Sequence, residues 1–369
     1  MLRLILVIFI SLSALQPSAI AQERLFTDLS LQYVSNYELT TKTFNDTTIG
    51  GFSGITYNPQ QEEYYLISDD RSSINPARFY TAKINYDDTG IKEVKIIGVN
   101  YLKNQQGQLY ANNNIDTEAI AYSPRNTLFI SSEGVSNKAI PPFINQYDLQ
   151  GNFLSAVPIP NRYIYDKKEN KGIQDNYGFE SLTIKANGIS KEDPFRLFTS
   201  TELALSQDFD PKNINSLLRS RMMHYVVNPF STPVLIAEHL YPVDKPPLGV
   251  IVNGISELLA LPQEGYLLSL ERNLGLRGFG AKIYQIVMAN ASDISNEKSL
   301  AGNIDSINPI SKKLVFDLQN LNIELDNLEG MTMGKPLADG NQSLILVSDN
   351  NFTPNRQKTQ FILLKMAYH

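Results

Sequence analysis

Short apolar runs separated by polar turns make up most of this sequence, and the runs recur in pairs. Five times, a run that begins with an acidic residue or a Ser-Gly pair is followed by a second run that ends in an acidic residue. Examples are 117–121 followed by 129–133, and 179–183 followed by 197–202. The runs are rich in branched and aromatic residues and lack the 3.6-residue periodicity of amphipathic helices, so they predict β-strands in an internal repeat.

The number of candidate strands predicts the fold. Each of the first four pairs is followed by two further candidate strands, whereas the fifth is followed only by 360–366, and an unassigned segment, 31–39, lies near the amino end. We therefore predict an all-β, five-bladed β-propeller in which the amino-terminal strand completes the last blade and closes the ring. The alternative is a six-bladed propeller with one blade hidden in a polar stretch, 160–178, 203–218 or 290–311.

The amino terminus has the features of a secretory signal peptide. Residues 1–21 contain a basic residue, the apolar run 4–15 and the small-residue site Ala19-Ile20-Ala21, which predicts cleavage after Ala21. The apolar run is short for a membrane span, so we expect no stable membrane insertion after cleavage. The prediction is an exported protein, periplasmic or extracellular, with a single propeller domain over 22–369.

Composition narrows the chemistry that the chain can perform. It contains no cysteine, which excludes disulfides, thiolate metal sites and cysteine nucleophiles. The formal net charge is −6 and no basic run is present, which argues against nucleic acid as a partner. Only three histidines occur, and there is no Gly-x-Ser-x-Gly or Walker motif, so neither a His-rich zinc site nor a serine triad is supported.

The acidic residues of the repeat are the candidate metal ligands. The first strand of each blade lines a propeller's axis, so we expect the first acids of successive copies to face one another. Crowded carboxylates raise one another's pKa unless a cation lies among them, and Ca²⁺ accepts about six to eight oxygen ligands. Each acid has a structural alternative, as a turn cap or an ion-pair partner. The predicted metal ligands are Asp70, Glu118, Glu133, Glu180, Glu202, Glu257, Glu271, Glu329 and Asp349.

Two arginines directly follow acids of the repeat. Arg71 and Arg272 can hold a phosphate or carboxylate oxygen through their planar guanidinium groups, or they can pair with the adjoining carboxylates. We predict Arg71, Arg272, Glu180 and Glu257 as catalytic residues, with the identity of the general base left open.

Several motifs, taken in order, resemble the phytase-like family that is described as having esterase-like activity. The resemblance covers roughly residues 50–365 and implies a propeller and calcium-assisted cleavage of phosphate or other esters; it does not imply phytate as the substrate. The first copy has Ser53-Gly54 where the family shows Glu-Gly, which leaves blade one without an inner carboxylate. The motifs include Ser68-Asp69-Asp70-Arg71, Asp116-Thr117-Glu118-Ala119-Ile120-Ala121, Gly178-Phe179-Glu180-Ser181-Leu182, Glu329-Gly330-Met331 and Val347-Ser348-Asp349-Asn350.

The leading functional hypothesis is a calcium-dependent hydrolase that acts on a small-molecule phosphoester or related ester. One alternative is a non-catalytic binding module that calcium stabilises, and another is a calcium-dependent lactonase. The sequence does not decide the oligomeric state.

Overall fold

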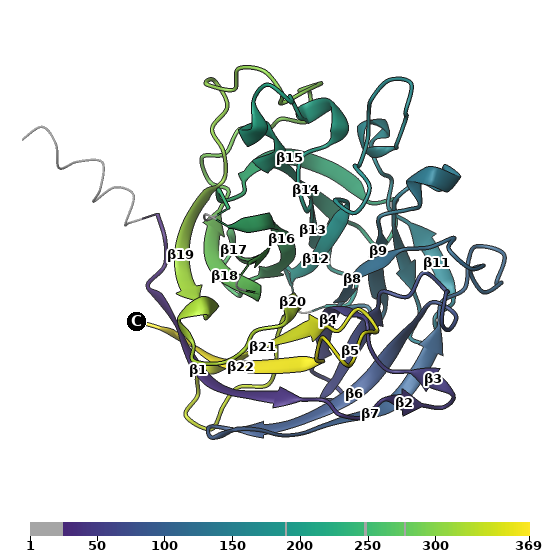
Figure 1. Ribbon diagram of the computed structural model, residues 1–369, viewed down its shortest axis with the longest axis vertical. Helices are drawn as coiled ribbons and strands as arrows, with labels where there is room; N and C mark the ends of the chain where they lie inside the picture. Colours follow the sequence, from purple (N-terminus) through teal and green to yellow (C-terminus); the bar gives the residue numbers. More distant parts are fainter. Residues whose placement is uncertain (1–24, 189, 247–248, 277) are drawn as a thin grey trace, which may run out of the picture.

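Five four-stranded antiparallel sheets are arranged radially around a central axis (Figure 1). The structure is a computed structural model and describes residues 25–188, 190–246, 249–276 and 278–369. The predicted signal peptide, 1–21, lies outside the described residues. The prediction of a five-bladed propeller is confirmed.

The four strands of each blade follow one another along the chain, from the axis outward, in blades one to four. Blade one consists of β4 (Phe52–Asn58), β5 (Glu63–Ser68), β6 (Arg78–Asp87) and β7 (Gly90–Tyr101). Blade two consists of β8 (Thr117–Tyr122), β9 (Leu128–Ser132), β10 (Phe143–Tyr147) and β11 (Phe153–Ala156). Blade three consists of β12 (Phe179–Ala186), β13 (Phe195–Thr201), β14 (Arg219–Val227) and β15 (Val234–Pro242). Blade four consists of β16 (Val250–Ala260), β17 (Tyr266–Gly275), β18 (Gly278–Val287) and β19 (Ser311–Asp317).

Blade five combines the two ends of the chain. Its strands are β20 (Asn327–Met333), β21 (Gln342–Asp349), β22 (Gln360–Tyr368) and the amino-terminal β1 (Leu29–Glu38). β1 pairs antiparallel with β22 from Leu29 opposite Tyr368 to Glu38 opposite Gln360. In Figure 1 the purple β1 lies along the yellow β22 at the rim. The predicted closure of the ring by the amino-terminal strand is therefore confirmed.

The polar stretches proposed to hide a sixth blade contain no named strand among their described residues. Three of the short 3₁₀ helices lie there, and a two-stranded hairpin follows β1 instead. The 3₁₀ helices are η1 (Ser136–Lys138), η2 (Asn161–Tyr163), η3 (Ser206–Asp208), η4 (Ile214–Leu218) and η5 (Leu318–Asn320), and the hairpin is β2 (Thr43–Phe44) with β3 (Thr47–Thr48). Within the described residues no helix has the length and apolar character needed to cross a membrane.

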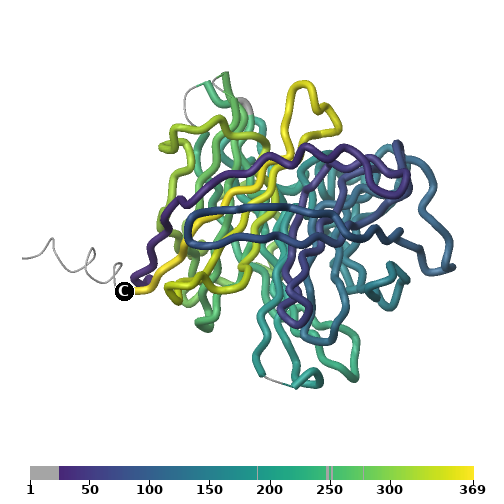
Figure 2. Tube along the Cα trace, turned by 90° about the horizontal axis from the view of Figure 1, so that it is seen from below, coloured from purple at the N-terminus to yellow at the C-terminus, as the bar shows by residue number. Residues whose placement is uncertain are grey.

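The hydrophobic core is divided among the interfaces between neighbouring blades. Phe52 and Leu66 of blade one pack with Ile345 and Val347 of blade five, and similar clusters fill the other interfaces. At the axis the inner strands approach closely, because a Cβ on Gly330 would lie 2.9 Å from the backbone nitrogen of Ile55. The strand ends that carry the repeated acids all open on one face, from which the loop 350–359 projects (yellow, Figure 2).

Candidate metal centre

A β-bulge interrupts the pairing between the first and second strands of every blade. In blade three, Phe179 pairs with Thr201 and Ser181 pairs with Ser200, so Glu180 is the extra residue. Bulges redirect side chains, and here they occur at the same place in each inner strand. The residues at the five bulges are Ser53, Glu118 with Ala119, Glu180, Ser256 and Glu329.

A second set of equivalent positions lies at the second strands. In each blade it is the residue that follows the pairing partner of the last residue before the bulge. Because Phe179 pairs with Thr201, the equivalent residue in blade three is Glu202. In blade four, Ile255 pairs with Glu271, so the equivalent residue is Arg272. In blades one, two and five the corresponding residues are Asp69, Glu133 and Asp349.

These registers correct the sequence alignment of the fourth copy by one residue. Ser256, not Glu257, is the counterpart of Glu180, and Arg272, not Glu271, is the counterpart of Glu202. The expectation that Glu257 faces the other first acids is therefore wrong. The physical reason is that a bulge adds a residue to one strand without changing the apolar pattern from which the copies were aligned.

Apart from Glu202, the acids at these positions line a cavity of about 760 Å³ at the mouth of the axis, here called the central cavity. One oxygen from each of Glu118, Glu133 and Glu180 lies within 4.8 Å of the other two, and the same holds for Asp69, Asp116 and Glu118. Among the described residues, the lining consists of Asp69, Arg71, Glu118, Glu133, Asn176, Glu180, Arg272, Leu274, Phe279, Asn327, Glu329, Asp349, Asn351, Arg356 and Gln357.

The two predicted arginines both lie in this cavity, and both are paired with carboxylates. Arg71 contacts the two oxygens of Asp116, each at 2.6 Å, through Nε and Nη2. Arg272 Nη2 lies 3.3 Å from Glu202 Oε1 and 3.4 Å from Glu329 Oε1. Burial by itself would lower the pKa of Arg272, but the surrounding carboxylates raise it above its usual value.

The other acids of the cavity lack a cationic partner. Asp69, Glu118, Glu133, Glu180 and Asp349 form no ion pair with any residue in the described ranges. Glu118 and Glu180 are 7% and 6% exposed, and neither carboxylate accepts a hydrogen bond from the described part of the chain. Buried carboxylates without a partner are costly when ionised, so this group needs protons or a bound cation.

The burial of these acids and their lack of cationic partners explain the shifts of their pKa values. Burial, assisted by repulsion from neighbouring acids, raises the pKa of Glu118 and Glu180 well above the usual value. Burial also raises the pKa of Glu133 to about 8, although the Gly178 amide opposes the shift. For Glu202, burial raises the pKa to about 7 while Arg272 opposes it. A cation among these groups would favour their ionised forms.

Four of the predicted ligands, Asp70, Glu202, Glu257 and Glu271, lie outside the lining of the central cavity, and each has partners of its own. Glu202 is paired with Arg272. Asp70 contacts Arg78 at 2.7 Å and accepts hydrogen bonds from three backbone amides of the following turn. Glu271 accepts a hydrogen bond from Tyr241 Oη at 2.8 Å and lies 2.5 Å from Lys312 Nζ.

Glu257 is the last of these four residues. Its Oε1 accepts hydrogen bonds from the amides of Leu182 at 3.0 Å and Leu258 at 2.9 Å, and its residue is 1% exposed. Burial raises its pKa well above the usual value. These contacts join two neighbouring inner strands below the central cavity.

Sequence reasoning did not select several residues in or beside the central cavity. Asp116 lies beside it, grouped with Asp69 and Glu118, and directly precedes the first run of the second copy; nothing in the sequence indicated that it pairs with Arg71. Asn176, Phe279 and Arg356 come from connecting segments or a strand end, where the repeat provides no guide. Their positions emerge only from the folded chain.

The chain resembles several solved structures at low sequence identity. No curated protein matches the sequence. Among solved structures, the catalytic domain of the Coprinopsis cinerea GH62 α-L-arabinofuranosidase is 10% identical, with a TM-score of 0.42 and coverage of 91% of this chain and 97% of that one. A glycosyl hydrolase from Bacteroides ovatus is 10% identical, with a TM-score of 0.45 and coverages of 89% and 94%.

The fold and the site define a five-bladed propeller with a carboxylate-lined cavity at the mouth of its axis. A family model for phytase-like proteins, described as "esterase-like activity of phytase", matches residues 47–352. The chain belongs to this phytase-like family. Its buried acidic clusters, formed by bulge residues and by acids at neighbouring strand ends, could hold a metal ion.

Proposed function

We propose that this protein is an exported, calcium-dependent hydrolase that cleaves phosphoesters or related esters in its central cavity. The observation that carries the proposal is the excess of carboxylates over cationic partners at the axis. Five acids of the cavity lack an ion pair among the described residues, whereas Arg71 and Arg272 are each engaged. The family's description as esterase-like gives the reaction class.

Glu118, Glu133 and Glu180 are the residues best suited to hold the cation. Oxygens bound to one Ca²⁺ lie about 2.3–2.6 Å from it, so two of them are separated by at most about 5 Å. The three carboxylates already present oxygens within 4.8 Å of one another. A donor set made only of carboxylate oxygens favours a hard cation over zinc. When bound, a divalent cation supplies charge neutralisation and activation of water.

The arginines contribute by orienting acids and by presenting positive charge to the substrate. Arg71 fixes Asp116 through two contacts, and its side chain remains 40% exposed toward the mouth of the cavity. Arg272 fixes Glu202 and Glu329, which belong to different blades. A guanidinium beside a cation suits the non-bridging oxygens of a phosphoester. An unprotonated carboxylate of the cavity then serves as the general base.

The test uses purified mature protein and a panel of phosphomonoesters, phosphodiesters, carboxylic esters and lactones, before and after chelation. We expect calcium-dependent turnover of a phosphoester, and a loss of at least about 100-fold in Glu180→Gln. Glu257→Gln is the matched control, because this glutamate is outside the lining of the central cavity, and it should retain activity. If the protein instead opens a lactone and releases no phosphate from the phosphoesters, the result would support a calcium-dependent lactonase.

One observation favours a second candidate, a non-catalytic module that calcium stabilises. All three histidines lie outside the lining of the central cavity: His224 is in β14, His239 is in β15 and His369 follows β22. The cavity therefore offers no imidazole for proton transfer. Failure of every substrate class to react, together with a lower melting temperature after chelation, would support this module and overturn the hydrolase proposal.

A further inference from the structure

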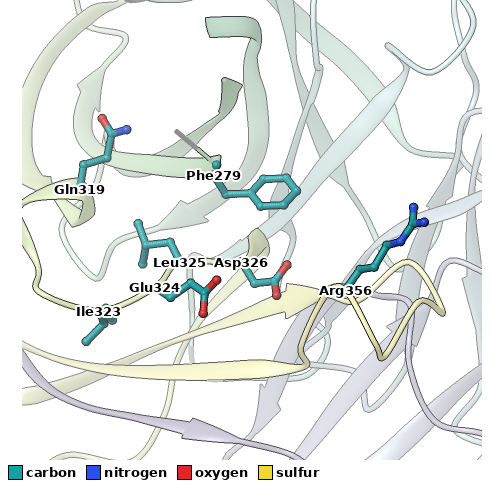
Figure 3. Close-up of a pocket in the computed structure, with 8 residues that line it drawn as sticks. Phe279, Gln319, Ile323, Glu324, Leu325, Asp326 and Arg356 are labelled. Atoms are coloured by element: carbon teal, nitrogen blue, oxygen red, sulfur yellow. The ribbon is translucent and has the colours of Figure 1, made fainter. Parts of the chain in front are cut away.

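A second pocket of about 580 Å³ adjoins the central cavity and is here called the side pocket (Figure 3). Two residues, Phe279 and Arg356, line both spaces, so the two spaces lie next to each other at these side chains. The described residues that line it are Gly278, Phe279, Gln319, Ile323, Glu324, Leu325, Asp326 and Arg356.

The side pocket combines an apolar wall with a polar rim. Phe279 of β18 provides an aromatic ring, and Ile323 and Leu325 come from the segment that precedes β20. Gln319 of η5 and Glu324 add polar groups, as Figure 3 shows. The carboxylate of Asp326 also belongs to the lining, so the pocket is mixed in character and not mainly apolar. Its apolar part can accept an organic group, and an aromatic ring favours stacking with another flat ring.

Arg356 differs from the other two arginines of the central cavity. Arg71 and Arg272 are ion-paired, whereas the guanidinium of Arg356 forms no ion pair or hydrogen bond with the described part of the chain. The neighbouring Asp326 is occupied, because it accepts hydrogen bonds from the amides of Asn327 and Lys358. A guanidinium with free donors at the junction of the two spaces is suited to an anionic oxygen.

We propose that the side pocket binds the organic group of the substrate, and that this group carries a flat ring. The inference rests on the proposed function for the position of the reacting ester in the central cavity. The ring packs against Phe279, the ester oxygen lies at the junction, and Arg356 contacts a non-bridging oxygen of the phosphate. The substrate class is thus an aryl phosphoester in preference to an alkyl one.

A fluorescent substitution tests binding without requiring turnover. The chain contains no tryptophan, so Phe279→Trp places a single indole at the junction. In the presence of calcium, we expect phenyl phosphate to change its emission in a saturable manner, and methyl phosphate at the same concentrations to leave it unchanged. Phe230→Trp is the matched control, because Phe230 is 86% exposed and belongs to neither cavity lining, and it should respond to neither compound.

Arg356→Ala in the Phe279→Trp background should weaken the binding of phenyl phosphate about tenfold. Because the indole can disturb the start of β18, calorimetry on the wild-type protein repeats the comparison of phenyl and methyl phosphate without a substitution. Equal affinity for the two compounds would overturn the proposal. So would an unchanged indole emission in the Phe279→Trp variant under conditions where calorimetry on the same variant detects binding of phenyl phosphate.

An activity comparison separates this inference from the proposed function. If the protein hydrolyses both compounds, Phe279→Ala should lower kcat/KM for phenyl phosphate about tenfold and change that for methyl phosphate less than about twofold. Selective binding of phenyl phosphate without any turnover would support the side pocket and count against the hydrolase. Turnover with no selectivity between the two compounds would support the hydrolase and overturn the side pocket.

Discussion

The central cavity and the buried network around Arg221 both remove several carboxylates from water, but only the network neutralises them. Arg221 Nε lies 2.6 Å from Asp208 Oδ2 and its Nη1 lies 3.3 Å from Glu238 Oε2, with all three side chains 0% exposed. In the central cavity, by contrast, Glu118 and Glu180 have no such partner among the described residues.

The difference separates structural acids from candidate functional acids. In the same network, Asp208 accepts a hydrogen bond from the Leu300 amide and Arg221 donates one to the Glu297 carbonyl. The network therefore fastens the long connection between β18 and β19 to blade three. Its charges are satisfied within the chain. Five acids of the central cavity have no ion pair among the described residues, so their charge has to be balanced by protons or by a bound cation.

The largest expected effect comes from breaking the satisfied network. Arg221→Met leaves the buried Asp208 without a cation and leaves Glu238 with Arg162 alone, whose Nε lies 3.6 Å from Glu238 Oε1. We expect the free energy of unfolding to fall by about 3–5 kcal/mol, because a buried charge that loses its partner is strongly destabilising. Urea unfolding by circular dichroism measures this loss. Arg356→Met, at an exposed arginine, is the matched control and should change stability by less than about 0.5 kcal/mol. A loss below about 1 kcal/mol for Arg221→Met would remove the contrast between the two regions.

Removing an acid from the central cavity should weaken calcium binding without destabilising the protein. Glu180→Gln relieves repulsion, so the calcium-free variant should be at least as stable as the wild type, while the Kd for calcium rises at least tenfold, or about 1.4 kcal/mol. Calorimetric titration measures the Kd. Glu238→Gln, in the Arg221 network, should lower stability and leave the calcium Kd unchanged. Equal calcium affinity of Glu180→Gln and wild type would show that Glu180 is not a ligand.

The pH dependence of the chelated protein sharpens the comparison. The pKa of Glu133 is raised to about 8 in the folded state, above its ordinary value of about 4.5, so the folded protein binds more protons than the unfolded one over this window. Stability should therefore fall by about 1 kcal/mol or more as pH rises from about 5 to about 8. Calcium should reduce this fall because it favours the ionised carboxylates. Melting scans at each pH, with calcium and with chelator, decide whether the slope changes as expected.

The smallest expected effect is at Glu257. In Glu257→Gln, the remaining amide oxygen can accept the hydrogen bonds from Leu182 and Leu258, so stability should change by less than about 1 kcal/mol. The Kd for calcium should stay within about twofold of the wild-type value. A tenfold weaker calcium affinity would restore this glutamate as a ligand despite its place outside the cavity lining.

The candidate site was predictable in outline, and adjacent residues show where the prediction stopped. Asp69 and Asp70 follow the same strand, yet Asp69 lines the central cavity and Asp70 is bound to Arg78. Sequence reasoning selected Asp70, because neighbouring acids look alike in a linear pattern. Ser256 and Glu257 are also adjacent, and only the strand pairing shows that Ser256, and not Glu257, is the counterpart of Glu180.

The sequence by itself determined the strands, their grouping into five units and the closure of the ring, because apolar periodicity and turn residues are local signals. It also determined that acids recur at the ends of the paired runs. Only the tertiary structure decided which acids meet, since bulges shift the register by one residue and ion partners such as Arg71 and Asp116 are joined across neighbouring blades. The tertiary structure likewise brought Arg356 and Phe279 to the lining of one pocket, because they lie on a loop and a strand that are far apart in the sequence.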